Sequence, residues 1–208
     1  MSKKYTQKTL IVFVLILISS CSTIQIAKNQ DQISHTSSNN LSKSSGFQLF
    51  GKLGFKSAST AGSARIDWLQ QLNIYTITIS GPLGSNRAIL KGDEFHAQMQ
   101  IQGQYIDGSP QDLSSELLGA SLPLGLMRFW VMGMPAPNHP FTKDTFYKNS
   151  EIYSGFLQLD WQLDFSRHKF FDAMYLPTRI QGSNQDHSFT LIVKDWRNIL
   201  NEKVSSNG

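Results

Sequence analysis

The single cysteine of the chain stands where it can be chemically modified. Cys21 follows Ser19 and Ser20 at the end of an uncharged apolar run, Leu10–Ile18, and three lysines precede that run. A basic segment, a short apolar segment and small residues before a cysteine are typical of a bacterial secretory signal with a lipoprotein processing site. We therefore expect Cys21 to be the first mature residue, with lipid on its sulfur and on its new amino group.

The alternative for this segment is an uncleaved N-terminal anchor with an incidental cysteine. The run Leu10–Ile18 is too short to cross a bilayer, which needs about 20 apolar residues. Ser22, rather than an aspartate, follows the cysteine. By resemblance to bacterial lipoproteins in general, this leaves the protein free to be sorted to the outer membrane, lipid-anchored and facing the periplasm. Apart from the covalent lipid on Cys21, the sequence indicates no cofactor.

The charge of the chain gives no indication of a nucleic-acid partner. The 208 residues carry 19 basic and 15 acidic side chains, but residues 1–20 hold three of the lysines and no acid. The mature protein would therefore keep 16 basic against 15 acidic side chains, a net charge of +1. Clusters of Lys and Arg interleaved with aromatic residues are missing from it.

Enzymatic activity is not indicated either. The five histidines are scattered without the spacing of metal ligands, and neither a Gly-x-Ser-x-Gly motif nor a phosphate-binding glycine loop is present. Asp160 and Asp164 are expected on the polar face of one strand, where solvation is a simpler role than catalysis. We expect neither a catalytic residue nor a metal site.

Composition divides the chain into four parts. Residues 1–20 are the expected signal peptide, 21–45 a serine-rich lipidated tether, 46–200 a single domain, and 201–208 a polar tail. An alternative for part of the tether is a short helix around 34–45, packed on the domain.

Alternation of apolar and polar residues dominates from Gly46 onward. It relates Phe47, Leu49 and Leu53, and it is longest in Leu157–Phe165, where Leu157, Leu159, Trp161, Leu163 and Phe165 alternate with polar residues. Strands with one apolar face indicate an antiparallel sheet packed on one side. Their regular spacing suggests a meander that closes toward a barrel.

Two helices are expected to interrupt the strands. Ser109 can cap a helix that has Pro110 at its first position and a stripe of leucines. A second helix is expected from about Leu122 to Met132, before a segment rich in glycine and proline. It is apolar almost all round, so it needs apolar surroundings on most sides, inside or across the mouth of the curved sheet.

Several motifs together resemble one family. Leu122–Pro135 (LPLGLMRFWVMGMP) resembles the Leu-Pro, Leu, Trp and Gly-x-Pro signature of LolB, the outer-membrane lipoprotein receptor. Ala64–Trp68 resembles its Ala-Arg-x-x-Trp strand, and Pro82–Ser85 its Pro-Leu-Gly turn; Trp161 and Trp196 stand where the last sheet tryptophans occur, with Pro177 between them. The resemblance covers residues 46–200. Gly81 replaces the frequent Asn, and Asp67 an apolar residue.

This resemblance implies a mainly β fold with helices (α+β): an incomplete antiparallel β-barrel covered by helices, enclosing an apolar cavity, as in LolA and LolB. It implies a monomer that accepts lipoproteins from the periplasmic carrier LolA and inserts them into the inner leaflet of the outer membrane. Its partners would be LolA, the acyl chains of the cargo and membrane lipid. The alternatives are another apolar-ligand carrier or envelope assembly lipoprotein on a similar half-barrel, and an envelope hydrolase.

Candidate site residues follow from this task. The acyl-chain lining is expected to include Trp68, Leu124, Met127, Trp130, Met132, Leu159 and Trp161, each with plain core packing as the alternative. Leu83, in a tight turn of glycines and proline, is expected to project and insert into the membrane or touch a partner. The alternative for Leu83 is a side chain folded back under its turn.

Overall fold

The computed structural model describes residues 46–146, 152–171 and 174–198. The expected signal peptide, the tether with Cys21, the possible helix around 34–45 and the polar tail lie outside the described residues. Within the described part of the chain, no helix is long and apolar enough to span a bilayer.

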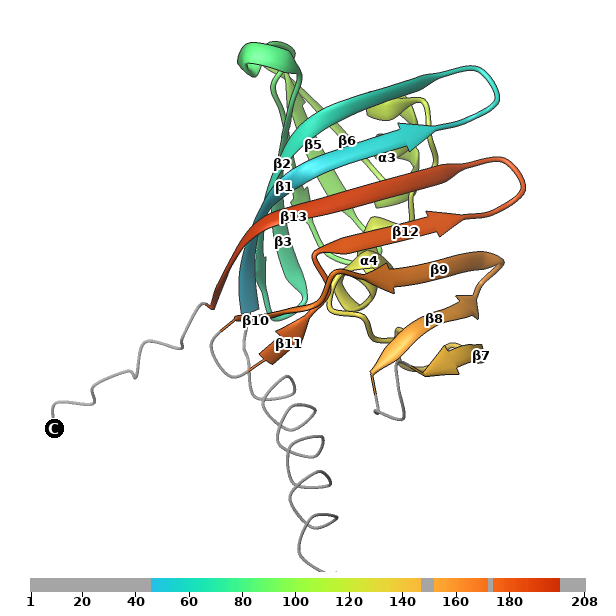
Figure 1. The fold of residues 1–208 in the computed structure, drawn as a ribbon. Coiled ribbons are helices and arrows are strands. Elements are labelled where there is room, and N and C mark those ends of the chain that lie inside the picture. Colours follow the sequence, from blue (N-terminus) through green and yellow to red (C-terminus); the bar gives the residue numbers. More distant parts are fainter. Residues whose placement is uncertain (1–45, 147–151, 172–173, 199–208) are drawn as a thin grey trace, which may run out of the picture. The chain divides into compact units, whose positions relative to one another are not determined.

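Eleven strands form one open antiparallel sheet in the order β6-β5-β4-β3-β2-β1-β13-β12-β9-β8-β7. The sheet curls on itself, and its end strands β6 and β7 are not neighbours, so the barrel is incomplete (Figure 1). Strands β10 and β11 form a separate hairpin. The predicted mainly β fold with two helices and an incomplete barrel is confirmed. The strands are β1 (Gly46–Lys56), β2 (Ala61–Gln71), β3 (Ile74–Ser80), β4 (Ala88–Gly92), β5 (Ala97–Ile101), β6 (Gln104–Gly108), β7 (Phe141–Phe146), β8 (Tyr153–Gln158), β9 (Trp161–Ser166), β10 (Lys169–Phe171), β11 (Met174–Leu176), β12 (Arg179–Ser183) and β13 (Ser188–Asn198).

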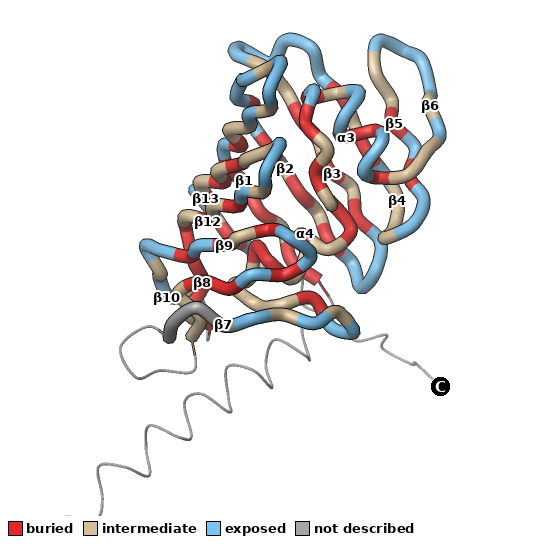
Figure 2. Tube along the Cα trace, turned by 90° about the vertical axis from the view of Figure 1, so that its right-hand side faces the viewer, coloured by how far each residue is buried: buried red, intermediate tan, exposed pale blue. Residues whose placement is uncertain are grey.

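One face of the sheet forms the core. Successive side chains of a strand point to opposite faces, so in β2 Ile66 and Trp68 are buried whereas Arg65 is exposed. Buried and exposed residues alternate in the same way along the neighbouring strands (Figure 2). Asp67 fits this pattern, because it points outward and accepts a hydrogen bond of 3.0 Å from Gln48. The unusual aspartate at position 67 therefore does not change which side chains of β2 face the core.

Both ends of helix α3 (Pro110–Leu118) are capped, and the N-terminal cap is the expected one. The hydroxyl of Ser109 accepts a hydrogen bond from the backbone N–H of Asp112, Pro110 occupies the first turn, and Gly119 ends the helix with φ of 64°. Glycine suits this last position because it adopts the left-handed conformation without steric cost. The helix predicted from its N-terminal cap and its leucine stripe is confirmed.

Helix α4 (Leu124–Trp130) is shorter than predicted, because residues 131–133 continue as turns. It lies behind β12 and β9 on the inner side of the sheet (Figure 1). Leu124, Met127 and Trp130 are buried in the same apolar core as the inner face of the strands. The prediction that an almost wholly apolar helix needs the inside of the curved sheet is therefore confirmed.

The prediction of one long strand over Leu157–Phe165 is wrong. Leu159 and Asp160 both have positive φ, 50° and 63°, and they form the two-residue turn between β8 and β9. This turn type has positive φ at both central residues and matches the twist of a hairpin. Gln158 pairs with Trp161 across the turn, so inward-facing residues have even numbers before it and odd numbers after it. Leu157 and Leu159 are consequently 40% and 45% exposed.

The hairpin turn generates a prediction for Leu159. An asparagine adopts a positive φ more readily than leucine, which pays on the order of 1 kcal/mol in this region. Leu159→Asn should therefore raise the free energy of unfolding by about 0.5–1 kcal/mol, as measured by urea denaturation. Leu163→Asn, at a fully buried position of β9, is the control and should lose about 3 kcal/mol or more. A comparable loss in Leu159→Asn would show that Leu159 belongs to the apolar interior.

Candidate functional site

The interior of the half-barrel is lined by aromatic rings, and helix α4 adds one more. The indole of Trp130 lies 6.2 Å from the ring of Trp161 between centroids, and Trp161 lies 5.5 Å from Phe189. A second group brings Phe47 to 5.9 Å from Trp68 and 5.2 Å from Trp196. Tilted and edge-to-face rings at these distances attract one another beyond their burial.

Gln158 attaches the end of α4 to the sheet. Its side chain is 1% exposed, and its amide oxygen accepts hydrogen bonds of 2.8 Å from the indole N–H of Trp130 and from the backbone N–H of Ala136. Its amide nitrogen donates to the carbonyl oxygens of Ala136 at 2.9 Å and His139 at 3.0 Å. Two acceptor positions and two donors are thus all used. This one side chain connects β8, α4 and the glycine- and proline-rich segment that follows α4.

Ser114 of α3 holds the segment that leads into α4. Its buried hydroxyl accepts a hydrogen bond of 2.8 Å from the backbone N–H of Leu122, and the carbonyls of Leu122 and Gln111 lie within 3.1 and 2.8 Å as acceptors for its proton. The two helices are therefore connected by a polar contact that is sequestered from water. Such a contact is costly to break because its partners would be left unsatisfied.

The outer side of α4 rests on two hairpin turns. A Cβ atom at Gly125 would lie 2.8 Å from the Cα of Glu94 in the β4–β5 turn, so only glycine allows this approach. Arg128 lies 3.7 Å from the carboxylate of Glu94 and donates a hydrogen bond of 3.3 Å to the carbonyl of Leu72 in the β2–β3 turn. These polar contacts are at the rim and partly exposed, in contrast to those of Gln158 and Ser114.

The seven residues expected to line an acyl-chain cavity separate into three groups. Trp68, Leu124, Met127, Trp130 and Trp161 are brought together in the interior and are at most 5% exposed. Met132 is half-buried against this core. Leu159 lies in the exposed hairpin turn, so its assignment to the lining is wrong. In this conformation the five interior residues pack against one another and against the sheet. This agrees with the alternative, plain core packing.

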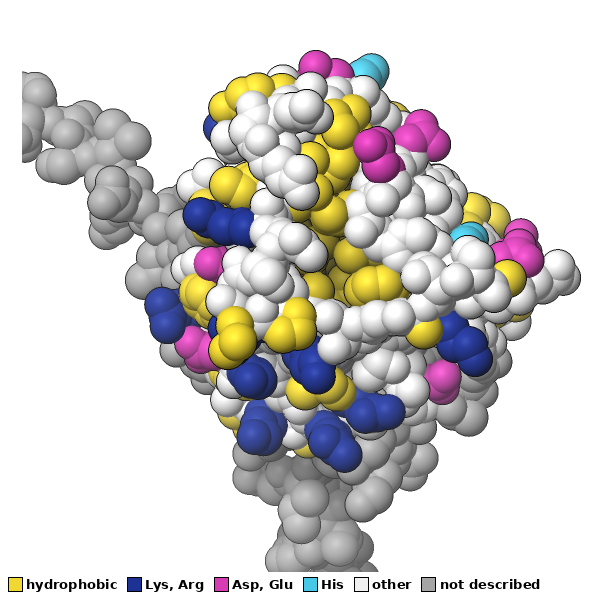
Figure 3. Space-filling model, turned by 90° about the horizontal axis from the view of Figure 1, so that it is seen from above, with side chains coloured by type: hydrophobic (Ala, Val, Ile, Leu, Met, Phe, Trp, Pro, Cys, Tyr) yellow, Lys and Arg dark blue, Asp and Glu magenta, His cyan; other side chains and the backbone are white. Residues whose placement is uncertain are grey.

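The upper face of the molecule opens onto this interior. Seen from above, the surface is hollowed, and hydrophobic side chains form the floor of the hollow (Figure 3). A different hollow, of about 460 Å³, lies at the outer side of β4, β5 and β6. It is lined by Lys91, His96, Ala97, Gln98, Asp107 and Gly108. None of the expected lining residues borders that second hollow, so the apolar opening is the candidate entrance.

Leu83 is held in a rigid turn and projects from it. The turn Pro82–Gly84 is closed by hydrogen bonds from the N–H of Gly84 to the carbonyl of Gly81, at 3.1 Å, and from the N–H of Gly81 to the carbonyl of Ser85, at 2.7 Å. Leu83 has φ of 57° and is 96% exposed. The expected projection is confirmed, and the side chain does not fold back under its turn. A left-handed conformation costs a leucine about 1–2 kcal/mol, which the surrounding hydrogen bonds must offset.

The buried interior of the barrel contains the phenol of Tyr75. Among the described residues, no group of three or more His, Cys, Asp or Glu side chains could hold a metal ion. The hydroxyl of Tyr75 is buried without a hydrogen-bond partner in the described part of the chain. Burial, and to a lesser extent the charge of Asp93, raises the pKa of Tyr75 above its usual range. The phenol of Tyr75 therefore stays neutral at physiological pH.

Comparison with known sequences identifies the family of this chain. The profile of the family described as "Outer membrane lipoprotein LolB" matches residues 45–196. The chain belongs to the LolB family. The outer-membrane lipoprotein LolB of Pseudomonas fluorescens is 34% identical over 154 residues, which cover 73% of this chain and 74% of that protein. LolB of Pseudomonas aeruginosa is also 34% identical, over 76% of this chain and 77% of the relative. The resemblance inferred from the motifs is thereby confirmed.

Solved structures show the same fold at low sequence identity. The LolA superfamily protein NE2245 from Nitrosomonas europaea matches with a TM-score of 0.51 and 10% identity, over 81% of this chain and 93% of that one. A DUF1329 family protein from Desulfovibrio piger gives a TM-score of 0.51 at 7% identity, over 84% and 93%. These likenesses concern the fold alone.

Gln158 is a residue of the interior whose buried position the sequence pattern did not reveal. A glutamine between apolar residues of an alternating segment is expected to face outward. Gln158 faces inward because the next two residues have positive φ and form a turn. We predict that Gln158→Ala lowers the free energy of unfolding by about 3 kcal/mol or more, because several buried groups lose their partners at about 1–3 kcal/mol each.

Urea denaturation measures this loss, and Gln98→Ala is the matched control. Gln98 is exposed and donates one hydrogen bond to Asp107, so its substitution should change stability by less than about 0.5 kcal/mol. Equal effects of the two substitutions would contradict the role of Gln158 in attaching α4.

Proposed function

We propose that this LolB-family chain is a lipid-anchored receptor of the outer membrane that accepts lipoproteins from a periplasmic LolA carrier. It then inserts them into the inner leaflet of the outer membrane. The observation that carries the proposal is the position of α4: an almost wholly apolar helix fills the inside of an open half-barrel. Family membership supports the same function.

Acyl chains are the cargo that such an interior suits. Each methylene buried from water contributes about 0.8 kcal/mol, so a lipoprotein with several acyl chains needs a continuous apolar path between carrier and membrane. Trp130, Met127 and Leu124 now occupy the interior themselves. An incoming chain replaces their apolar contacts by equivalent ones, so the apolar part of the exchange requires little net free energy. Displacement of Trp130 would also break its hydrogen bond to Gln158. Met127 and the half-buried Met132 suit chains of varied shape because their side chains are flexible and polarizable.

Leu83 is the proposed contact of the domain with the membrane. A leucine gives roughly 1.5–3 kcal/mol when it leaves water for an apolar phase. This is enough to bring the rim of the half-barrel against a bilayer for a short time, and it is far less than the free energy of burying acyl chains. Leu83 should therefore govern delivery rather than acceptance.

The experiment that tests the function is a transfer reaction. The purified lipidated chain is mixed with a LolA–lipoprotein complex, and the location of the lipoprotein is followed by affinity capture of each protein. We expect the cargo to move from LolA to this chain, and then to added phospholipid vesicles. Cargo that stays on LolA would contradict the proposal. Binding of a free lipid or glycolipid in place of the lipoprotein would favour another apolar-ligand carrier.

Leu83→Glu should separate the two steps. The charge at the exposed tip leaves the interior unchanged, so the variant should take lipoprotein from LolA normally but release it into vesicles at least tenfold more slowly. Leu72→Glu is the matched control, because Leu72 is 73% exposed and also has positive φ, at 53°, but lies in the β2–β3 turn at the other end of the strands. Loss of the first step in Leu83→Glu would instead make Leu83 a docking residue for LolA.

Cys21→Ala tests the proposed anchor. The expected result is that metabolic labelling with palmitate marks the native chain but not the variant, because Cys21 is the only cysteine of the chain. Protease resistance of the domain should be the same in both proteins. Label on the variant, or on neither protein, would contradict lipidation at this residue.

A further inference from the structure

Positive charge is concentrated on one part of the sheet. Residues 46–92, which form β1 to β4 with their connections, contain five basic residues and one acidic residue, Asp67. Seen from above, Lys and Arg side chains gather at one side of the molecule, and most Asp and Glu side chains lie elsewhere (Figure 3). The nearly neutral net charge of the mature chain therefore hides a polarised surface.

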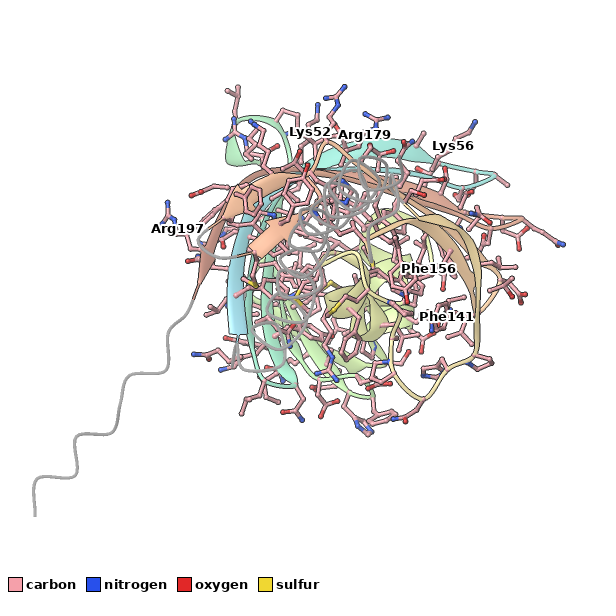
Figure 4. The ribbon with its side chains drawn as sticks, turned by 60° about the horizontal axis from the view of Figure 1, so that its bottom comes forward. Lys52, Lys56, Phe141, Phe156, Arg179 and Arg197 are labelled. Atoms are coloured by element: carbon pink, nitrogen blue, oxygen red, sulfur yellow. The ribbon has the colours of Figure 1, made fainter. Side chains whose placement is uncertain are left out.

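Two of these cations, Lys52 and Arg65, form a row with Arg179 across the outer face of the sheet. Lys52 on β1 is directly opposite Arg65 on β2, and on its other side it is opposite Ile192 on β13, which in turn is opposite Arg179 on β12. The side chains of Lys52 and Arg179 both point away from the barrel, whereas Phe141 and Phe156 point into it (Figure 4). Neighbouring strands lie about 4.8 Å apart, so the row spans roughly 14 Å.

The row lacks compensating acids. No carboxylate among the described residues lies within 4.0 Å of Lys52, Arg65 or Arg179 in an ion pair, and Arg179 has only the neutral amide of Gln181 as a partner, at 3.0 Å. Arg197 on the same face is different: it lies 3.0 Å from Asp195 and 4.7 Å over the ring of Phe50. Like charges directly opposite each other on a sheet destabilise it. Folding alone therefore gives no reason to place Lys52 opposite Arg65.

The register connects this row to the projecting leucine. Arg65 on β2 is opposite Ser80, the last residue of β3, and the Leu83 turn begins directly after Ser80. Arg87 follows the same turn and is exposed. The apolar tip thus has one cation, Arg65, on the strand that pairs with β3 and another, Arg87, between the turn and β4. This combination suits a bilayer surface, where phosphate groups lie directly above the apolar phase.

We propose that Arg65, Lys52 and Arg179, together with Arg87, bind the phosphate groups of anionic phospholipids and so orient the Leu83 turn on the membrane. The inference rests on the proposed function in one respect, the contact of Leu83 with the bilayer. Arginine and lysine bind phosphate through charge-assisted hydrogen bonds. Contact of each cation with an anionic surface favours the docked state by about fivefold.

The test follows the Leu83 turn directly, without cargo. Ser85→Cys introduces a thiol beside Leu83, and a lipidated Cys21 would not react with a maleimide because its sulfur is a thioether. The full lipidated chain, labelled with an environment-sensitive fluorophore, is reconstituted into vesicles of phosphatidylcholine alone or of equal parts phosphatidylcholine and phosphatidylglycerol. Unlabelled parent protein without Ser85→Cys checks that Cys21 is blocked. The blue shift of the fluorophore reports the fraction of inserted turns.

We expect insertion to be greater in the anionic vesicles and to fall as salt rises toward 1 M, where the Debye length is about 3 Å. Combined Lys52→Gln, Arg65→Gln and Arg179→Gln substitutions should reduce the ratio of inserted to free turns by about tenfold to a hundredfold in anionic vesicles. Arg197→Gln is the matched control on the same face, and it should leave the ratio unchanged because Asp195 already neutralises its charge. Lys52→Gln alone should lower the ratio about fivefold and serves if the triple variant is unstable.

Three results would overturn the inference, and they differ in what else they affect. Equal insertion into neutral and anionic vesicles would exclude the phosphate contact and leave the proposed function intact. Unchanged insertion of the triple variant with slower cargo transfer from LolA would assign the row to an acidic protein partner. Insertion into neither type of vesicle would remove the membrane role of Leu83 as well, whereas acceptance of cargo from LolA would still stand.

Discussion

The buried amide of Gln158 is the contact on which the arrangement of the interior depends. Its four hydrogen bonds fix Trp130, Ala136 and His139 to β8, and so determine both the depth of α4 in the barrel and the path of the segment that leaves it. A buried polar network of this kind specifies one arrangement when every member is satisfied. Apolar packing alone would hold α4 inside the sheet but would allow it to slide. The hydrogen bonds of the Gln158 amide are directional, whereas apolar contacts are not, so the amide fixes the position of α4.

Much of this fold could be read from the sequence, because its elements carry local physical signals. Ser109, Pro110 and Gly119 mark the ends of α3, and the apolar character of α4 requires a buried place. The β8–β9 turn could not be read in the same way. Leu159 and Asp160 lack the glycine or asparagine that usually marks such a turn. The alternation of apolar and polar residues therefore continues through the turn, although the chain reverses its direction there. Leu159 was misplaced, and Gln158 was missed, for this single reason.

The candidate site was predictable in kind more than in detail. Trp68, Leu124, Met127, Trp130 and Trp161 do meet in the interior, because inward-facing residues of a curved sheet and an enclosed helix have no other place to go. Which of them would be displaced by cargo depends on the attachments of α4, and these involve backbone carbonyls and glycine that no pattern of side-chain types reveals. Gly125 against Glu94 and Arg128 against Leu72 are examples. The exposure of Leu83 was the simplest feature to predict, because a side chain in a tight turn of this kind points into solvent.

The two end strands, β6 and β7, are separated in the sheet order by all the others, so no ladder of hydrogen bonds joins them. A closed barrel has a circumference set by its strand number and tilt, and widening it requires breaking backbone hydrogen bonds. The hydrogen-bond ladders of an open sheet impose no such restriction, because the two end strands can move apart while every strand keeps its neighbours. The backbone hydrogen bonds of this sheet therefore do not fix the volume that it encloses. This suits the proposed role, in which the lipoproteins received differ in the number and length of their hydrocarbon tails.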